Sequence, residues 1–108
     1  MEEKEREEIL ARIQLTEQAL QNLLLQKQSF QLELLETENA LSEVKSTKGD
    51  VFKIVGPVLV KAKKEDLIPE LEKKKEILEL RIKSIEKQEQ EMKEKLTKER
   101  EEALKKLK

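Results

Sequence analysis

The chain has 108 residues, of which 44% are charged and 2% are aromatic, and it contains no Cys, His, Trp or Tyr. Its 23 basic and 24 acidic residues are interspersed, so it offers no broad basic face to nucleic acid, and disulfide and thiol chemistry are excluded. Two Gly and two Pro in such a charged chain are typical of long helices with narrow apolar seams, not of one compact core.

The chain also lacks the features of membrane and exported proteins. No apolar run approaches the length of a membrane span, and the acidic start, Met1-Glu2-Glu3-Lys4, does not look like a signal peptide. The sequence therefore predicts a cytoplasmic protein with no membrane partner.

The first predicted element is a helix over about residues 2–45, a stretch without Gly or Pro. Alternate steps of four and three residues along it select a seam of mostly apolar positions. These are Ile9, Ile13, Thr16, Leu20, Leu23, Lys27, Phe30, Leu34, Thr37, Leu41 and Val44. This heptad spacing predicts a coiled coil with another helix.

The next element is a predicted β-hairpin over about residues 51–62, centred on the pair Gly56-Pro57. Gly accepts positive φ at the first turn position and Pro fits the second, as in a type II′ turn. Both faces of the hairpin are mainly apolar, and an isolated hairpin with open edges is only marginally stable.

Two interpretations of the hairpin remain open. It is either an assembly surface that joins other subunits in a larger sheet or closed β-barrel, or an apolar cap folded onto its own helices. The first interpretation assigns oligomerisation to its apolar side chains. They are Val51, Phe52, Ile54, Val55, Val58, Leu59 and Val60.

A second helix is predicted over about residues 66–106, with Asp66 as its N-cap and Pro69 in its first turn. The same alternating steps give a seam of equal length. It consists of Ile68, Leu71, Lys75, Leu78, Ile82, Ile85, Glu89, Met92, Leu96, Glu99 and Ala103.

The two seams match when the helices run antiparallel, with the numbers of facing residues adding to 112. Layers near the hairpin are then almost wholly apolar, whereas most layers toward the chain ends contain a polar residue, and Lys27 lies one layer from Glu89. Either these polar residues set the register, or they weaken the seam and keep apolar side chains available. The predicted fold is thus a mainly α, antiparallel coiled-coil hairpin with a β-hairpin at the bend.

The segment from Val51 to Glu89, "VFKIVGPVLVKAKKEDLIPELEKKKEILELRIKSIEKQE", lies between the two long helices and resembles prefoldin beta subunits, most of all the archaeal ones. The resemblance extends more loosely over residues 1–108 as a single domain. It implies a hexamer of two alpha-class and four beta-class subunits, whose hairpins build a β-barrel platform carrying coiled-coil arms. It also implies an ATP-independent chaperone that holds unfolded polypeptides at the arm tips and delivers them to a group II chaperonin.

The register brings the two chain ends together, and six residues there are candidates for contact with unfolded polypeptides. They are Ile9, Leu10, Ile13, Ala103, Leu104 and Leu107. Converging apolar side chains ringed by Lys and Glu suit a weak, sequence-tolerant grip. Alternatively, these residues only close the ends of the coil.

Enzyme chemistry is not indicated. Without His and Cys the chain lacks the commonest proton shuttle and the soft metal ligands, and it has no Gly-rich phosphate loop. We therefore expect no catalytic residue, metal or cofactor. The competing function is a coiled-coil scaffold or tether, in which the hairpin serves only for oligomerisation.

Overall fold

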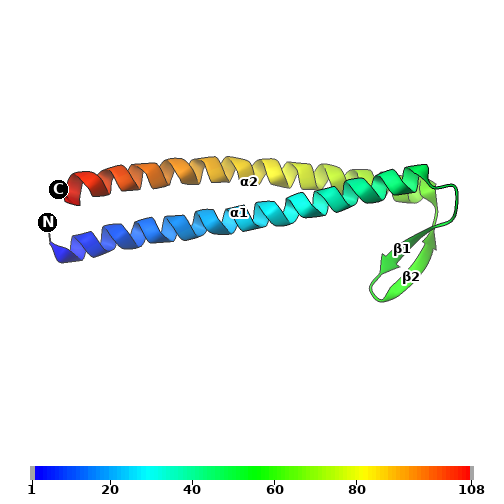
Figure 1. Cartoon of the computed structure of the whole chain (residues 1–108), viewed down its shortest axis with the longest axis horizontal. Coiled ribbons are helices and arrows are strands. Elements are labelled where there is room, and N and C mark those ends of the chain that lie inside the picture. Colours follow the sequence, from blue (N-terminus) through cyan, green and yellow to red (C-terminus); the bar gives the residue numbers. More distant parts are fainter. Residues whose placement is uncertain (1, 108) are drawn as a thin grey trace. The chain divides into compact units, whose positions relative to one another are not determined.

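The computed structural model describes the backbone of residues 2–107 and the side chains of residues 2–106. The elements follow in the order α1 (Glu3–Ser46), β1 (Val51–Val55), β2 (Val58–Ala62) and α2 (Lys64–Leu107) (Figure 1). They form two compact units. We call Met1–Gln28 with Lys83–Lys108 the terminal unit, and Ser29–Ile82 the hairpin unit. The predicted mainly α fold, with one β-hairpin between two long helices, is confirmed.

Both predicted seams are confirmed by burial. Every described side chain at a seam position is buried or half-buried, in α1 as in α2. Because seam positions recur every 3.5 residues on average, each helix turns one continuous stripe toward its partner. Along residues 2–107 neither helix combines the length and the low charge that a bilayer span needs.

The helices pair antiparallel within each unit. In the terminal unit the hydroxyl of Thr16 contacts Glu99 and the ammonium of Lys27 contacts Glu89, so a later residue of α1 meets an earlier one of α2. Contacts between the helices of the hairpin unit follow the same order: the guanidinium of Arg81 lies 5.7 Å from the ring centroid of Phe30, Lys74 lies 3.6 Å from Glu33, and Lys45 lies 3.2 Å from Glu72.

The β-hairpin forms with the predicted bounds and turn. Val51 pairs with Ala62, and Val55 pairs with Val58 across the two-residue loop. Gly56 has a φ of +58°, which an L-residue with a side chain rarely adopts, and Pro57 supplies the negative φ of the next position. The register places Val51, Val55, Val58 and Val60 on one face, and Phe52, Ile54 and Leu59 on the other, so both faces are mainly apolar as predicted.

The predicted start of the second helix is wrong. The backbone amides of Asp66 and Leu67 donate to the carbonyl of Lys63 at 3.1 and 2.9 Å, so α2 begins at Lys64 and Asp66 lies in its first turn, not at its N-cap. At this position its carboxylate is still stabilised by the positive, N-terminal end of the helix dipole. Pro69 consequently lies inside the helix and not in its first turn.

The early helix start follows from the short connection after β2, in which Lys63 alone separates Ala62 from α2. The ammonium of Lys64 donates a hydrogen bond to the backbone carbonyl of Thr47, which ties the start of α2 to the end of α1. Pro69 has no amide hydrogen for the carbonyl of Glu65, so one bond of the helical ladder is lost.

Candidate functional site

The hairpin presents an apolar surface that its own chain leaves open. We call its seven oligomerisation candidates the hairpin surface. Val51, at the root of the hairpin, is buried with 8% of its surface exposed, whereas Ile54 is 75% and Leu59 is 64% exposed. Phe52, Val55, Val58 and Val60 are exposed as well. Both faces therefore remain accessible in the single chain.

The root of the hairpin is attached to the helices by one buried side chain and one ion pair. Val51 lies in a hollow that it shares with Val44 and Thr47 of the α1 end. On the same face, the ammonium of Lys53 lies 2.5 Å from a carboxylate oxygen of Glu70 in α2. Because this pair is solvent-exposed, it contributes about 0–1 kcal/mol and fixes direction more than stability. The interpretation of the hairpin as an apolar cap on its own helices therefore holds only at the root of the hairpin.

The apolar candidates at the chain ends divide into buried and accessible residues. Ile9 and Ala103 are buried and Ile13 is half-buried, so these three help to close the helix pair. Leu10 is 49% and Leu104 is 64% exposed, because both lie beside the seam. The side chain of Leu107 lies outside the described part of the structure.

Charged side chains surround the apolar candidates. Ile9 shares a small hollow with Glu5, Glu8 and Arg12 of α1 and with Lys106 of α2. Lys106 also lies 3.1 Å from Glu102, and this hydrogen bond lowers the pKa of Glu102. The terminal unit therefore offers isolated leucines within a polar rim, not a continuous apolar patch.

The polar residues of the terminal seam satisfy one another across the two helices. The hydroxyl of Thr16 lies 2.6 Å from Glu99, and the ammonium of Lys27 donates to Glu89 at 3.1 Å. Lys93 lies 3.5 Å from the other oxygen of Glu89. The hydrogen bond between Lys27 and Glu89 is the main cause that lowers the pKa of Glu89 and raises that of Lys27. The Lys27–Glu89 contact suggested by the sequence is confirmed.

Sequence reasoning missed a group of exposed apolar side chains on the helices. Leu15 and Leu25 belong to the terminal unit, and the hairpin unit adds four more. These are Leu32, Leu35, Ile77 and Leu80. They lie at heptad positions outside the seam, so a search that follows only the inward positions does not select them. Their signal in the sequence is an apolar residue at an outward position of a charged helix.

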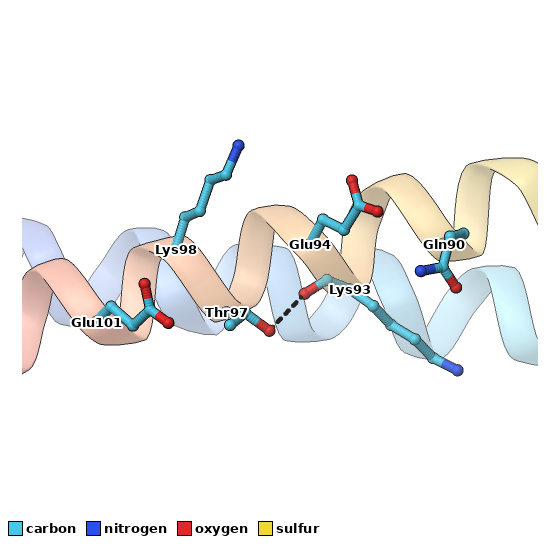
Figure 2. Close-up of a pocket in the computed structure, with 6 residues that line it drawn as sticks. All are labelled: Gln90, Lys93, Glu94, Thr97, Lys98 and Glu101. Carbon is cyan, nitrogen blue, oxygen red and sulfur yellow. Dashed lines mark hydrogen bonds between the residues drawn. The ribbon is translucent and has the colours of Figure 1, made fainter.

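A hollow lies on the outer surface of α2 in the terminal unit. It is lined by residues of this one helix, among them Lys93, Glu94, Lys98 and Glu101 (Figure 2). The hydroxyl of Thr97 donates to the carbonyl of Lys93 at 3.0 Å, an ordinary bond within the helix. Mixed charges on an exposed helix form a solvated face, so this hollow carries no chemistry.

Comparison with known proteins decides the family. A family model described as "Prefoldin subunit" matches residues 7–108. The chain belongs to the prefoldin family. It is 41% identical over 88 residues to prefoldin subunit beta of Archaeoglobus fulgidus, which covers 80% of this chain and 76% of that relative. It is 39% identical over 103 residues to prefoldin subunit beta of Pyrobaculum aerophilum, covering 94% and 82%.

The fold agrees with a prefoldin structure. The crystal structure of the prefoldin beta subunit from Thermococcus strain KS-1 superposes with a TM-score of 0.85 at 35% identity, covering 96% of this chain and 93% of that one. The resemblance found in the sequence is thereby confirmed. Prefoldin is a family of chaperone subunits and not an enzyme family, so the chain is a chaperone subunit that assembles with other subunits.

Proposed function

We propose that this chain is a beta-class subunit of a cytoplasmic, ATP-independent chaperone with two alpha-class and four beta-class subunits. The observation that carries the proposal is the hairpin surface, which is apolar on both faces and mostly exposed in the single chain. Neighbouring hairpins cover it by joining into a β-barrel platform, because closure removes the open strand edges.

The chain ends of the terminal unit capture unfolded polypeptides in this proposal. Leu10 and Leu104 are exposed beside the seam and supply apolar contact. Ile9, Ile13 and Ala103 hold the helices that carry them. The surrounding charges keep empty ends of different arms from adhering to one another. Each contact is weak, so captured chains are released without ATP and pass to a group II chaperonin.

The test replaces the two accessible leucines, in a Leu10→Ser and Leu104→Ser variant. Oligomer mass should stay unchanged, while suppression of aggregation should weaken for several unrelated denatured proteins, because the lost apolar area is not replaced. The matched control is Leu32→Ser with Leu35→Ser, which changes two similarly exposed leucines of the hairpin unit and should leave suppression unchanged.

Two results would contradict the proposal. Wild-type suppression by the Leu10 and Leu104 variant would show that the chain ends do not capture unfolded proteins. An intact wild-type oligomer that suppresses the aggregation of no denatured protein would favour a scaffold or tether. Transfer is tested separately, by adding a group II chaperonin to a loaded complex and following release of the labelled polypeptide.

A further inference from the structure

One stretch of the outer face of α1 in the terminal unit, between residues 14 and 28, carries no charge. Between residues 14 and 28, every heptad position that points away from α2 holds an uncharged, exposed side chain. We call these seven residues the amide face. They are Gln14, Leu15, Gln18, Gln21, Asn22, Leu25 and Gln28.

The charges of this segment are turned toward α2. Residues 14–28 contain two charged side chains, Glu17 and Lys27. Glu17 lies 3.0 Å from Arg100, and Lys27 donates to Glu89. Both charged groups are thus engaged by the partner helix, and about four helical turns of the outer surface are left to amides and leucines.

The outer face of α2 in the same unit is charged, so the uncharged face of α1 is not typical of the molecule. At the outward positions of α2, charged residues dominate, including Lys87, Glu94, Lys98 and Glu101. Figure 2 shows part of this face, with Lys98 and Glu94 extending away from the ribbon. In a chain with 44% charged residues, an uncharged outer face calls for its own explanation.

Amide side chains suit a partner with exposed peptide groups. Each Gln or Asn offers two N–H donors and a carbonyl acceptor, the same set that pairs with backbone C=O and N–H groups. An unfolded polypeptide exposes those backbone groups together with apolar side chains, which Leu15 and Leu25 can contact. Without charges, the face does not discriminate between acidic and basic segments.

The size of the amide face excludes a stable dimer with a second copy. Stable protein interfaces bury about 1,200–2,000 Å² with roughly 20–30 residues from each partner, whereas this face has seven residues. A small, uncharged surface of this kind holds an extended segment weakly.

We propose that the amide face is a second binding surface for unfolded polypeptides, one that recognises their main chain. This inference rests on the proposed chaperone function, to which it adds a site distinct from Leu10 and Leu104. The main chain is common to all polypeptides, so the face contributes affinity without sequence preference.

The test replaces Gln14, Gln18, Gln21 and Gln28 by Ala, which favours the helix and removes four of the five amide side chains, while Asn22, Leu15 and Leu25 remain. The matched control replaces Lys87, Glu94, Lys98 and Glu101 of α2 by Ala. The probe is reduced, carboxymethylated α-lactalbumin, a permanently unfolded protein. We expect about tenfold weaker binding for the Gln variant, roughly the loss of one net hydrogen bond at the upper end of the usual range. The α2 control should bind as the wild type does.

A second probe separates main-chain recognition from other effects. A short fluorescent peptide rich in Leu and Val is compared with the same peptide N-methylated at alternate residues, which removes half of its backbone donors. N-methylation should weaken binding to the wild type and change little for the Gln variant.

The outcomes distinguish this proposal from the proposed function. Three results would contradict the binding role of the amide face. The Gln variant could bind as tightly as the wild type, the Gln variant and the α2 control could lose affinity equally, or N-methylation could have the same effect on the wild type and the Gln variant. If the Leu10 and Leu104 variant still loses suppression in that case, the proposed function stands without it. Helix content and melting temperature by circular dichroism confirm that each variant is folded.

Discussion

The two units place polar groups differently in otherwise equivalent seams. Thr16 and Thr37 both donate to a carbonyl of their own helix, that of Arg12 at 3.1 Å and that of Glu33 at 2.8 Å. In the terminal unit Thr16 and Lys27 also reach across to carboxylates of α2. Separation of the helices would therefore break polar contacts in the terminal unit and leave that bond of the hairpin unit intact.

Water compensates for the broken polar contacts but not for lost apolar burial. Once apart, both units would expose apolar side chains that are now buried, such as Leu96 in the terminal unit and Leu78 in the hairpin unit. Part of the terminal seam, however, consists of Lys27 and Glu89, which would be hydrated. We infer that the terminal unit opens locally at lower cost and that the hairpin unit is the firmer of the two.

The largest expected effect comes from the hairpin surface. Ile54→Asp with Leu59→Asp places two carboxylates where each aliphatic side chain would contribute about 1.5–3 kcal/mol on full burial. The oligomer should dissociate into subunits that remain helical, because the seams are untouched. Sedimentation and circular dichroism measure the two properties. Ile77→Asp with Leu80→Asp, at exposed positions on α2 of the same unit, is the control and should stay assembled. An intact oligomer for the Ile54 and Leu59 variant would exclude the platform.

The next prediction compares the two seams directly, and its expected effect is smaller. Leu78 of the hairpin unit and Leu96 of the terminal unit are both buried, and truncation of a buried Leu to Ala costs about 2–5 kcal/mol. We expect Leu78→Ala to lie toward the upper end, since the next seam residue, Ile82, is buried and apolar, and Leu96→Ala toward the lower, since the polar pair of Thr16 and Glu99 belongs to the same part of the seam. Thermal unfolding at fixed protein concentration gives the order, and equal or reversed losses would contradict the comparison of the units.

The sequence predicted those features that depend on local pattern. Gly56-Pro57 determines the turn and hence the hairpin register, and the described positions that the heptad spacing selects are all buried or half-buried. Leu67 is also buried, although the spacing does not select it. The start of α2 was missed because Asp66 is a good cap by residue type, while the bond from Lys64 to the carbonyl of Thr47 joins residues far apart in sequence.

The candidate site was predictable only in part. Ile9 and Leu10 are neighbours of similar character, yet one is buried and the other half exposed, because they lie on different sides of the seam boundary. The amide face was not predicted from the sequence, because no single Gln is unusual on an exposed helix. It is recognised only when the charges of Glu17 and Lys27 are seen to be turned toward α2.

The smallest predicted effect is a pH dependence of the terminal unit. The pKa of Glu89 is lowered in the folded protein, chiefly by the hydrogen bond from Lys27. Its contribution to stability is therefore present above the ordinary glutamate pKa of about 4.3 and is lost as the pH falls through the lowered value. The pKa of Lys27 is raised, so its contribution is complete below the ordinary lysine pKa of about 10.4 and is lost only as the pH rises through the raised value.

Hydrogen exchange of residues 13–28 measures this dependence across the acid range. Lys27→Leu with Glu89→Leu removes both groups and serves as the control. It should lose less protection than the wild type between neutral and acid pH. If both proteins lose protection equally, other carboxylates account for the acid sensitivity.

The turn of the hairpin is restricted by handedness and not by space. Gly56 has a φ of +58°, yet no atom outside its immediate neighbours lies within 4 Å of the position that a Cβ would occupy. An L-residue there would be strained whatever its size, whereas a D-residue has the mirror-image backbone preference and prefers this region. A chemically ligated chain with a D-amino acid at position 56 would keep the turn and carry its side chain into open space. Residue 56 is thus a place where a fluorophore or a cross-linker can be attached to the tip of the hairpin without disturbing either strand.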